Sequence, residues 1–453
     1  MHTRGGAVRE RGACPGRAEP AGRARALSWF LAAALVLLAC LSPTAAYAST
    51  CAGGALQIVA HEDDDLLFQS PDVLADIEAG RCVRTIYVTA GDAAQGSAYW
   101  HSRERGSQAA YAQMAGVANE WTTSSITVAG SSIRLQTLTA SPQISLAFMR
   151  LPDGNRSGTG MVSHHHESLM RLWESAITSI SAVDGSASYT DASLRSTLTA
   201  LMVGFRPTTI RTQDWVAEFG QGDNADHIGT ALYTRAAAQG YDSAHTLISY
   251  GGYPTWTRLP NVSGAELTAK QAAFHAYAAE DSSLCLRPWC ADDLVYSLRL
   301  VRQYITATES PANSARRAGV VATASSQNRR AGQVAGKAVD GIALGFPSNR
   351  SKEWATVGGT SGSWIQLDYP TPTTINGVVL ADRPNLEDQI TGAVLQFSDG
   401  SEVATGPLPN NGSAVSLSFS ARTTTSVRLT DTSVSATTRS EGLAELETYA
   451  TMP

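Results

Sequence analysis

The sequence predicts an α/β domain with a mostly parallel sheet and flanking helices, followed by an all-β sandwich. Before about residue 310, short apolar runs alternate with helical patterns, which is typical of strand-helix-strand units and of Rossmann-like sheets. After residue 310 helical periodicity does not return, and short strands alternate with Gly, Asn, Asp and Pro turns. A chain of 453 residues, 43% hydrophobic and 16% charged, is long enough for two globular domains and a leader.

The first 48 residues have the pattern of a signal peptide. Six arginines precede an apolar run at 29–41, and Ala46-Tyr47-Ala48 offers small residues for cleavage. The run is shorter than the roughly 20 residues that a membrane helix needs. We therefore expect a secreted, extracellular protein without an integral membrane segment. The segment before Cys40 loosely resembles a lipoprotein box, and anchoring through Cys40 is the alternative.

The leader also determines the charge and cysteine count of the mature chain. Residues 1–48 hold six arginines and two glutamates, so cleavage moves the formal net charge from −6 to −10, and no nucleic-acid partner is expected. Four cysteines remain in an exported chain without CxxC spacing, which favours disulfides over a metal site. Among three possible pairings we expect Cys51 with Cys82, because both precede neighbouring parallel strands, and Cys285 with Cys290 across a short loop.

The elements of the first domain, residues 49–308, follow from their patterns. Leu56 to Ala60 and Arg84 to Thr89 are apolar runs on either side of a helical stretch, so they predict parallel strands with a right-handed crossover. A longer helix with a small-residue face is predicted from Trp100 to Gly116. A buried strand at 208–212 and a helix at 227–238 follow.

The second domain is predicted at residues 315–453, after a linker of Ser, Pro and Asn at 309–314. Its short apolar segments are separated by turn residues, so each is expected to be a strand of the sandwich. These segments are 320–322, 364–367, 378–380, 393–397, 415–419 and 426–429.

A His-Glu-Asp-Asp segment follows the first predicted strand. His61 and Asp64 lie past its carboxyl end, where open α/β sheets place their ligands, and zinc accepts both imidazole and carboxylate. A catalytic zinc needs a third protein ligand, and His227, at the start of a later helix, is the candidate. Asp63 is then free to act as a general base on water, which suits hydrolysis of an amide. A solvated acidic turn is the alternative.

Four ordered motifs resemble the PIG-L/LmbE family of zinc-dependent de-N-acetylases, over about residues 55–250. They are Ala60-His61-Glu62-Asp63-Asp64-Asp65, Thr89-Ala90-Gly91-Asp92, Arg103 ahead of Ala115-Gly116-Val117, and Asp226-His227. The resemblance implies zinc held by His61, Asp64 and His227, with Asp63 as the base.

The same resemblance implies that Arg103 contacts substrate hydroxyls and that Asp92 shapes the pocket. Two positions depart from the family pattern: Glu62 replaces a proline, and Asn224 stands where a histidine is usual. An asparagine can donate a hydrogen bond to an oxyanion, but it cannot deliver a proton. Either the activity is reduced, or the proton for the leaving amine comes from Asp63 or from another side chain, for which Asp223 is a candidate and a solvated turn residue the alternative.

The remaining histidines and aromatic residues have no assigned chemistry. His164-His165-His166 follows several glycines, so we expect exposed imidazoles in a loop, with lining of the substrate cleft as the alternative. Three aromatic residues near the motifs can stack on sugar rings or pack in the core. They are Tyr99, Trp100 and Trp215.

The second domain resembles discoidin-like, galactose-binding-fold modules over about residues 315–449. The matching segments are 322–326, 338–341, 354, 364–368, 382–385 and 442–445. The resemblance implies an eight-stranded jelly roll, a fold that often binds glycans and often holds calcium near its Asp-Gly loop. Calcium at Asp340 would suit a hard cation that favours oxygen ligands. A plain turn aspartate is the alternative.

These patterns predict a secreted zinc-dependent hydrolase that removes N-acetyl groups from the acetylamino sugars of a glycan or glycoconjugate. The second domain would localise the enzyme on a polymer. Two alternatives remain at this point. One is a carbohydrate-binding protein with a degenerate deacetylase site, which Asn224 motivates. The other is another zinc-dependent amidase, such as a thiol-conjugate amidase.

Overall fold

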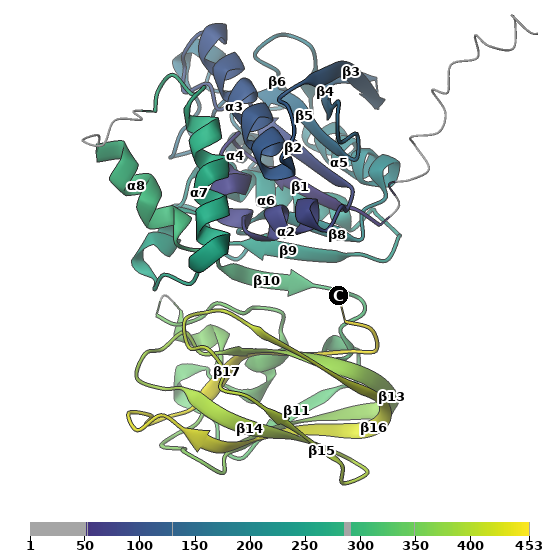
Figure 1. The fold of residues 1–453 in the computed structure, drawn as a ribbon, viewed down its shortest axis with the longest axis vertical. Helices are drawn as coiled ribbons and strands as arrows, with labels where there is room; N and C mark the ends of the chain where they lie inside the picture. The colour runs from purple at the N-terminus through teal and green to yellow at the C-terminus, as the bar shows by residue number, and fades with distance from the viewer. Residues whose placement is uncertain (1–50, 52, 129, 285–290, 348, 453) are drawn as a thin grey trace, which may run out of the picture. The chain divides into compact units, whose positions relative to one another are not determined.

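The computed structural model describes residues 51–452 except 52, 129, 285–290 and 348. The predicted signal peptide, Cys40 and the predicted Cys285–Cys290 disulfide lie outside the described residues. An α/β domain and an antiparallel β-sandwich follow one another along the chain (Figure 1). Within the described ranges, no helix is both long enough and apolar enough to cross a membrane.

A mixed sheet of eight strands forms the centre of the α/β domain. Its strands are β1 (Ala55–Val59), β2 (Val83–Thr89), β3 (Trp121–Val128), β4 (Ser131–Leu138), β5 (Ile144–Leu151), β8 (Thr209–Gln213), β9 (Thr246–Tyr250) and β10 (Ile305–Glu309). Their order is β10-β9-β8-β1-β2-β5-β4-β3. The neighbours from β9 to β5 are parallel, and the pairs at both edges are antiparallel. The predicted α/β class is confirmed.

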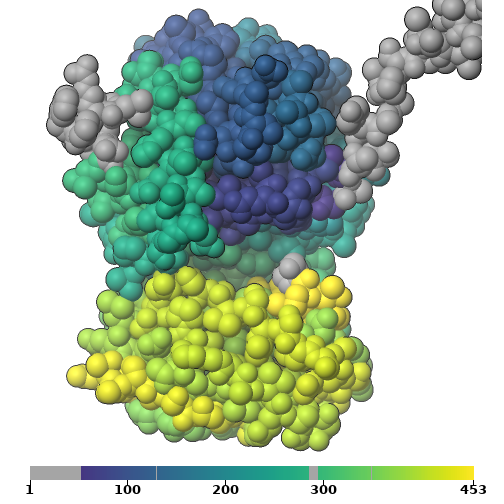
Figure 2. Space-filling view, in the orientation of Figure 1, coloured from purple at the N-terminus to yellow at the C-terminus, as the bar shows by residue number. Residues whose placement is uncertain are grey.

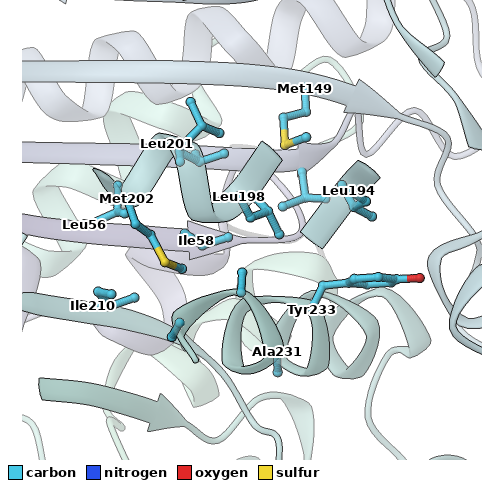
Figure 3. Close-up of a cluster of buried hydrophobic side chains, with 14 of the residues drawn as sticks. Leu56, Ile58, Met149, Leu194, Leu198, Leu201, Met202, Ile210, Ala231 and Tyr233 are labelled. Atoms are coloured by element: carbon cyan, nitrogen blue, oxygen red, sulfur yellow. The ribbon is translucent and has the colours of Figure 1, made fainter. Parts of the chain in front are cut away.

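Helices cover both faces of this sheet because successive side chains of a strand point to opposite faces. Ile58 and Val59 of β1 accordingly belong to two different buried clusters. On the Ile58 face lie α4 (Leu169–Trp173), α5 (Asp191–Phe205) and α6 (Ala225–Ala238). Figure 3 shows leucines of α5 and residues of α6 packed against β1.

The Val59 face has its own set of helices. They are α2 (Asp72–Glu78), α3 (Ser97–Ala115) and α7 (Gly264–Ala278). Helices α3 and α7 pack side by side (Figure 1 and Figure 2). The shorter elements of the domain are the π-helical turn Asp65–Gln69, the 3-10 turns Val162–His164 and Tyr253–Thr257, β6 (Ile180–Ser181), β7 (Ser188–Tyr189) and α8 (Ala291–Leu300).

A disulfide joins the starts of the first two strands. Cys51 and Cys82 are bonded, with their Cα atoms 5.3 Å apart. Strands β1 and β2 are parallel neighbours in which Ala55 lies opposite Val83. The pairing therefore arises in the way that the sequence predicts, from two strands that begin at one edge of the sheet.

The second domain is an antiparallel all-β sandwich, as predicted. Its strands are β11 (Val321–Ala324), β12 (Trp354–Ala355), β13 (Trp364–Asp382), β14 (Ile390–Phe397), β15 (Glu402–Thr405), β16 (Val415–Val434) and β17 (Gly442–Tyr449), with 3-10 turns at Ser314–Arg316, Arg329–Ala331, Ala335–Val339 and Arg350–Lys352. Strands β13 and β16 each contain two of the predicted segments. Register shifts in their pairing allow such long strands to bend around one core, which includes the buried Trp354.

Candidate active site

The candidate site lies where the strand order of the α/β sheet changes direction. Along the chain, β1 is followed by β2 on one side and later by β8 on its other side. The loops after β1 and β8 therefore diverge at one edge of the sheet, which is where open α/β sheets bind ligands. The first loop carries His61 to Asp64, and the second leads into α6, which carries His227.

His61, Asp64 and His227 come together as a group that could hold a metal ion. One oxygen of Asp64 lies 3.1 Å from His61 Nδ1, and the other lies 3.0 Å from His227 Nε2. All three side chains are buried. Asp64 Oδ1 and His227 Nε2 lie 3.0 Å apart, but among the described residues neither atom forms a hydrogen bond of good geometry. Buried polar atoms rarely lack partners, and a cation bound by both atoms would satisfy them.

The electrostatics of the group also favour a cation. Burial opposes ionisation of Asp64, but the imidazoles of His227 and His61 hold the pKa of this carboxyl well below its usual range. Burial lowers the pKa of His227, yet Asp64 and Asp223 together raise that pKa to about 9. Without an ion, the site thus keeps imidazole protons next to an ionised carboxylate. A metal ion can replace those protons.

Outer carboxylates orient both imidazoles. His227 Nδ1 lies 2.9 Å from Asp223 Oδ1, and His61 Nε2 lies 3.5 Å from Asp226 Oδ2. A carboxylate behind a ligating imidazole fixes the orientation of the ring and is typical of zinc sites. From the sequence, Asp223 is a candidate substitute proton donor or a solvated turn residue, so its contact with the ring was not predicted.

Gln213 supports the central carboxylate from the next strand. Its Nε2 donates to Asp64 Oδ2 at 2.7 Å, and its Oε1 accepts from the Ala60 N–H at 3.0 Å. This residue was missed in the sequence. The sequence does show a polar side chain at the carboxyl end of a buried strand. That side chain can be assigned to the site only when β8 is known to pair with β1.

Asp63 lies beside the ligand group and is held by Arg103. Arg103 Nη2 donates to Asp63 Oδ1 at 2.6 Å, Nη1 to the Gly91 carbonyl at 2.8 Å, and Nε to the Tyr277 hydroxyl at 2.8 Å. The guanidinium is thus engaged by the protein itself, whereas contact with substrate hydroxyls was predicted. Burial raises the pKa of Asp63 although Arg103 opposes the rise. A raised pKa makes this carboxylate a better proton acceptor.

With this geometry in place, comparison with known families identifies the first domain. Residues 56–238 match the family model PIG-L, described as GlcNAc-PI de-N-acetylase. These residues are a PIG-L domain. The PIG-L domain includes both loops that bring His61, Asp64 and His227 together. Residues 313–449 match the model of a domain of unknown function, DUF7402.

Solved structures similar to this chain include carbohydrate-binding modules. A truncated AlyQ with CBM32 and alginate lyase domains is 22% identical, covers 28% of this chain and has a TM-score of 0.23, and this chain covers 31% of its length. CpGH89CBM32-5 from Clostridium perfringens, in complex with GalNAc-β-1,3-galactose, is 20% identical over 29% of this chain and 95% of that one, with a TM-score of 0.24.

A third similar structure is the family 32 CBM of NanJ from C. perfringens, in complex with galactose. It is 18% identical over 29% of this chain and 93% of that chain, with a TM-score of 0.24. Likeness at this level does not assign a ligand to this chain. No curated protein matches the chain significantly.

Asn224 begins the helix of the PIG-L domain that carries His227. Its side-chain oxygen accepts from the Asp226 N–H at 2.9 Å and so caps α6. Because the carbonyl end of the amide faces the helix, the NH₂ end is the one left to donate to another group. The cap thus leaves the NH₂ group of Asn224 unused, and the oxyanion role of this residue stays a prediction.

Asp92 organises two loops of the PIG-L domain from a fully buried position. Its Oδ1 accepts from the Asp153 N–H at 3.0 Å, and its Oδ2 accepts from the Ala94 N–H at 3.1 Å. Its Oδ2 also lies 2.7 Å from His164 Nε2. His165 and His166 are exposed, as expected for this loop, but the prediction is wrong for His164, which packs against Asp92.

The predicted aromatic and calcium positions differ in their burial and contacts. Trp100 and Trp215 are buried in the core, and Tyr99 is half-buried. In the sandwich, Asp340 lies 3.0 Å from Lys337 Nζ and also accepts from a backbone N–H. Among the described residues, no candidate metal-binding group includes Asp340. Calcium at Asp340 and the turn-aspartate alternative both stay predictions.

Proposed function

We propose that the protein is a secreted, zinc-dependent hydrolase that removes N-acetyl groups from acetylamino sugars of a glycan or glycoconjugate. The observation that carries the proposal is the buried group of His61, Asp64 and His227 beside Asp63 in a PIG-L domain. Two imidazoles and one carboxylate are a donor set of catalytic zinc sites, which keep one position open. The family description names de-N-acetylation.

The proposed location and substrate class have separate support. The basic and apolar leader favours export, and so does the Cys51–Cys82 disulfide, because disulfides persist in oxidising compartments. The sequence resemblance of the second domain to discoidin-like modules supports a polymeric glycan as the substrate. In this proposal the sandwich domain keeps the enzyme on its polymer.

Each residue of the site has a separate role in the proposed reaction. When bound, zinc would polarise the acetyl carbonyl and lower the pKa of water. Asp63 accepts a proton from the attacking water, and Arg103 keeps the carboxylate in place. The amide of Asn224 donates to the carbonyl oxygen as it gains negative charge. The C–N bond then breaks, acetate forms, and the amine nitrogen takes up a proton.

The test is acetate release from a panel of N-acetylated oligosaccharides, with a thiol-conjugate amide included. We expect acetate from at least one glycan, loss of activity with a chelator, and recovery on addition of zinc. Protein that binds glycans but holds no stoichiometric zinc, and stays inert after zinc addition, would instead be the carbohydrate-binding alternative. Hydrolysis confined to the thiol conjugate would instead indicate the amidase.

Gly91 allows a direct test of how Arg103 positions Asp63. Its φ of +49° favours glycine, and a Cβ atom there would overlap Arg103 Nη1 and lie 2.7 Å from Glu62 Oε2. We expect Gly91→Ala to lower kcat by about 100-fold, because displacement of a catalytic group by about 1 Å costs that much. Bound zinc should be unchanged when measured by atomic absorption.

The matched control is Gly96→Ala in the same loop. Gly96 has a φ of −73°, and an added Cβ meets nothing within 4 Å. This variant should keep normal kcat. Equal activity of the two variants would contradict the positioning role of the Arg103 contact.

A further inference from the structure

The proposed reaction leaves one role open, the donor of a proton to the leaving amine. Asn224 occupies the position near the ligand group from which a side chain could act, but an amide cannot deliver a proton. A second titratable side chain is needed, unless Asp63 returns the proton that it takes from water.

We propose that His164 is the general acid that protonates the leaving amine, and that Asp92 is its positioning residue. The proposal rests on the proposed function and assigns a group to its last step. An imidazole that is hydrogen-bonded to a carboxylate is suited to this work, because the carboxylate fixes the orientation of the ring.

The geometry begins with the contact between the two side chains. His164 Nε2 lies 2.7 Å from Asp92 Oδ2, so this ring nitrogen can donate to the carboxylate, which leaves Nδ1 as the nitrogen not used in this contact. Asp92 is fully buried, whereas the side chain of His164 is 21% exposed. Of the pair, His164 is therefore the one that a substrate can reach.

Asp92 links His164 to the ligand group. Its other oxygen accepts from the Asp153 N–H at 3.0 Å. The Asp153 carboxylate in turn belongs to a cluster with His61 and Asp226, whose potential ligand atoms lie within 4.8 Å of one another. The imidazole of His164 is thus linked through the Asp92 carboxylate to the backbone of Asp153, a residue of the cluster that contains His61.

The loop that carries His164 is anchored to the site at its base. The Gly160 N–H donates to the Gly154 carbonyl at 2.9 Å, and the Gly154 N–H donates to Asp226 Oδ2 at 2.8 Å. A Cβ atom at Gly160 would lie 2.7 Å from His166 Cα, so the loop is packed against itself. The loop that carries His164 is thus connected by backbone hydrogen bonds to Asp226, whose carboxylate lies 3.5 Å from His61 Nε2.

In the proposed step, the C–N bond of the amide is broken and a proton is transferred to the leaving nitrogen. As the tetrahedral intermediate collapses, the electron pair of the C–N bond goes to nitrogen and the carbonyl of acetate re-forms. The proton on His164 Nδ1 moves to the departing nitrogen. The proton that Asp63 took from water returns through solvent to His164. The acetic acid that forms gives its remaining proton to the amine through solvent, so each turnover converts one amide and one water into acetate and a protonated amine.

The test compares His164→Gly with His165→Asn, a change at the adjacent exposed residue, whose φ of +54° asparagine tolerates. On an N-acetylated oligosaccharide, His164→Gly should lower kcat by about 10²- to 10⁴-fold with KM and bound zinc unchanged. Added imidazole should restore part of that kcat, measured against wild type in the same imidazole. His165→Asn should match wild type.

Each other outcome has a definite meaning. His164→Gly within about threefold of wild type would assign the proton to Asp63 and overturn the role of His164. Loss of kcat without rescue by imidazole, or loss accompanied by loss of zinc, would show a structural role and overturn it as well. Wild-type protein that releases no acetate would instead overturn the proposed function, independently of His164.

Discussion

Asp63→Asn is expected to keep its bound zinc and to lose about 10²- to 10⁴-fold in kcat, the usual contribution of a general base. The amide oxygen can still accept the hydrogen bond from Arg103, which in the native chain spans 2.6 Å, so the local fold should persist. What the variant lacks is an atom that takes a proton from water. The measurement is acetate release at saturating substrate, together with zinc content.

The chain offers a matched control for this substitution. Asp184, in the loop between β6 and β7, forms the same kind of pair with Arg150, also at 2.6 Å. Asp184→Asn should therefore leave kcat unchanged. Full acetate release by the Asp63→Asn protein would refute the role of Asp63, whatever the control shows.

Asp64→Ala is expected to abolish both zinc binding and acetate release. Asp64 is the only residue of the group that contacts both imidazoles among the described atoms, at 3.1 and 3.0 Å. We expect zinc affinity to fall by more than about 100-fold, the upper end of what loss of an outer partner costs. The metal-free variant should also unfold more readily than the metal-free wild type, because each buried imidazole loses one of its two carboxylate partners.

Asp65→Asn is the control for that experiment. Asp65 is the next residue and is equally buried, but it accepts hydrogen bonds from Tyr87 and Tyr111, which an asparagine oxygen can also accept. Its zinc content should stay at the wild-type level in equilibrium dialysis. Normal zinc content in Asp64→Ala would remove Asp64 from the ligand set.

The parts of the fold with strong local patterns could be predicted from the sequence. The apolar strand at 55–59 and the helix at 225–238 are continuous, buried and regular, so their periodicity indicated both their type and their place. The hairpin of β3 and β4 was not predicted. Strand β3 is rich in serine and threonine and mostly exposed at the sheet edge, so it has neither the apolar run nor the alternation of a buried strand.

The residues of the site that belong to sequence motifs could be predicted. The sequence placed His61, Asp64 and His227 after strands that end at one sheet edge, and the structure brings them together. It did not indicate Gln213 or the contact of His164 with Asp92, because both depend on which distant strands and loops become neighbours. Such contacts are set by the assembled sheet, and no local pattern encodes them.

The separation of the ligands along the chain has a consequence for the folded protein as a whole. Most of the PIG-L domain lies between Asp64 and His227 in the sequence. An ion bound by both residues would therefore cross-link the two ends of that segment in the folded state. A ligand that binds only the folded state adds about 2.7 kcal/mol of stability at a concentration 100 times its Kd. An ion bound at this site would therefore also protect the folded domain from proteolysis.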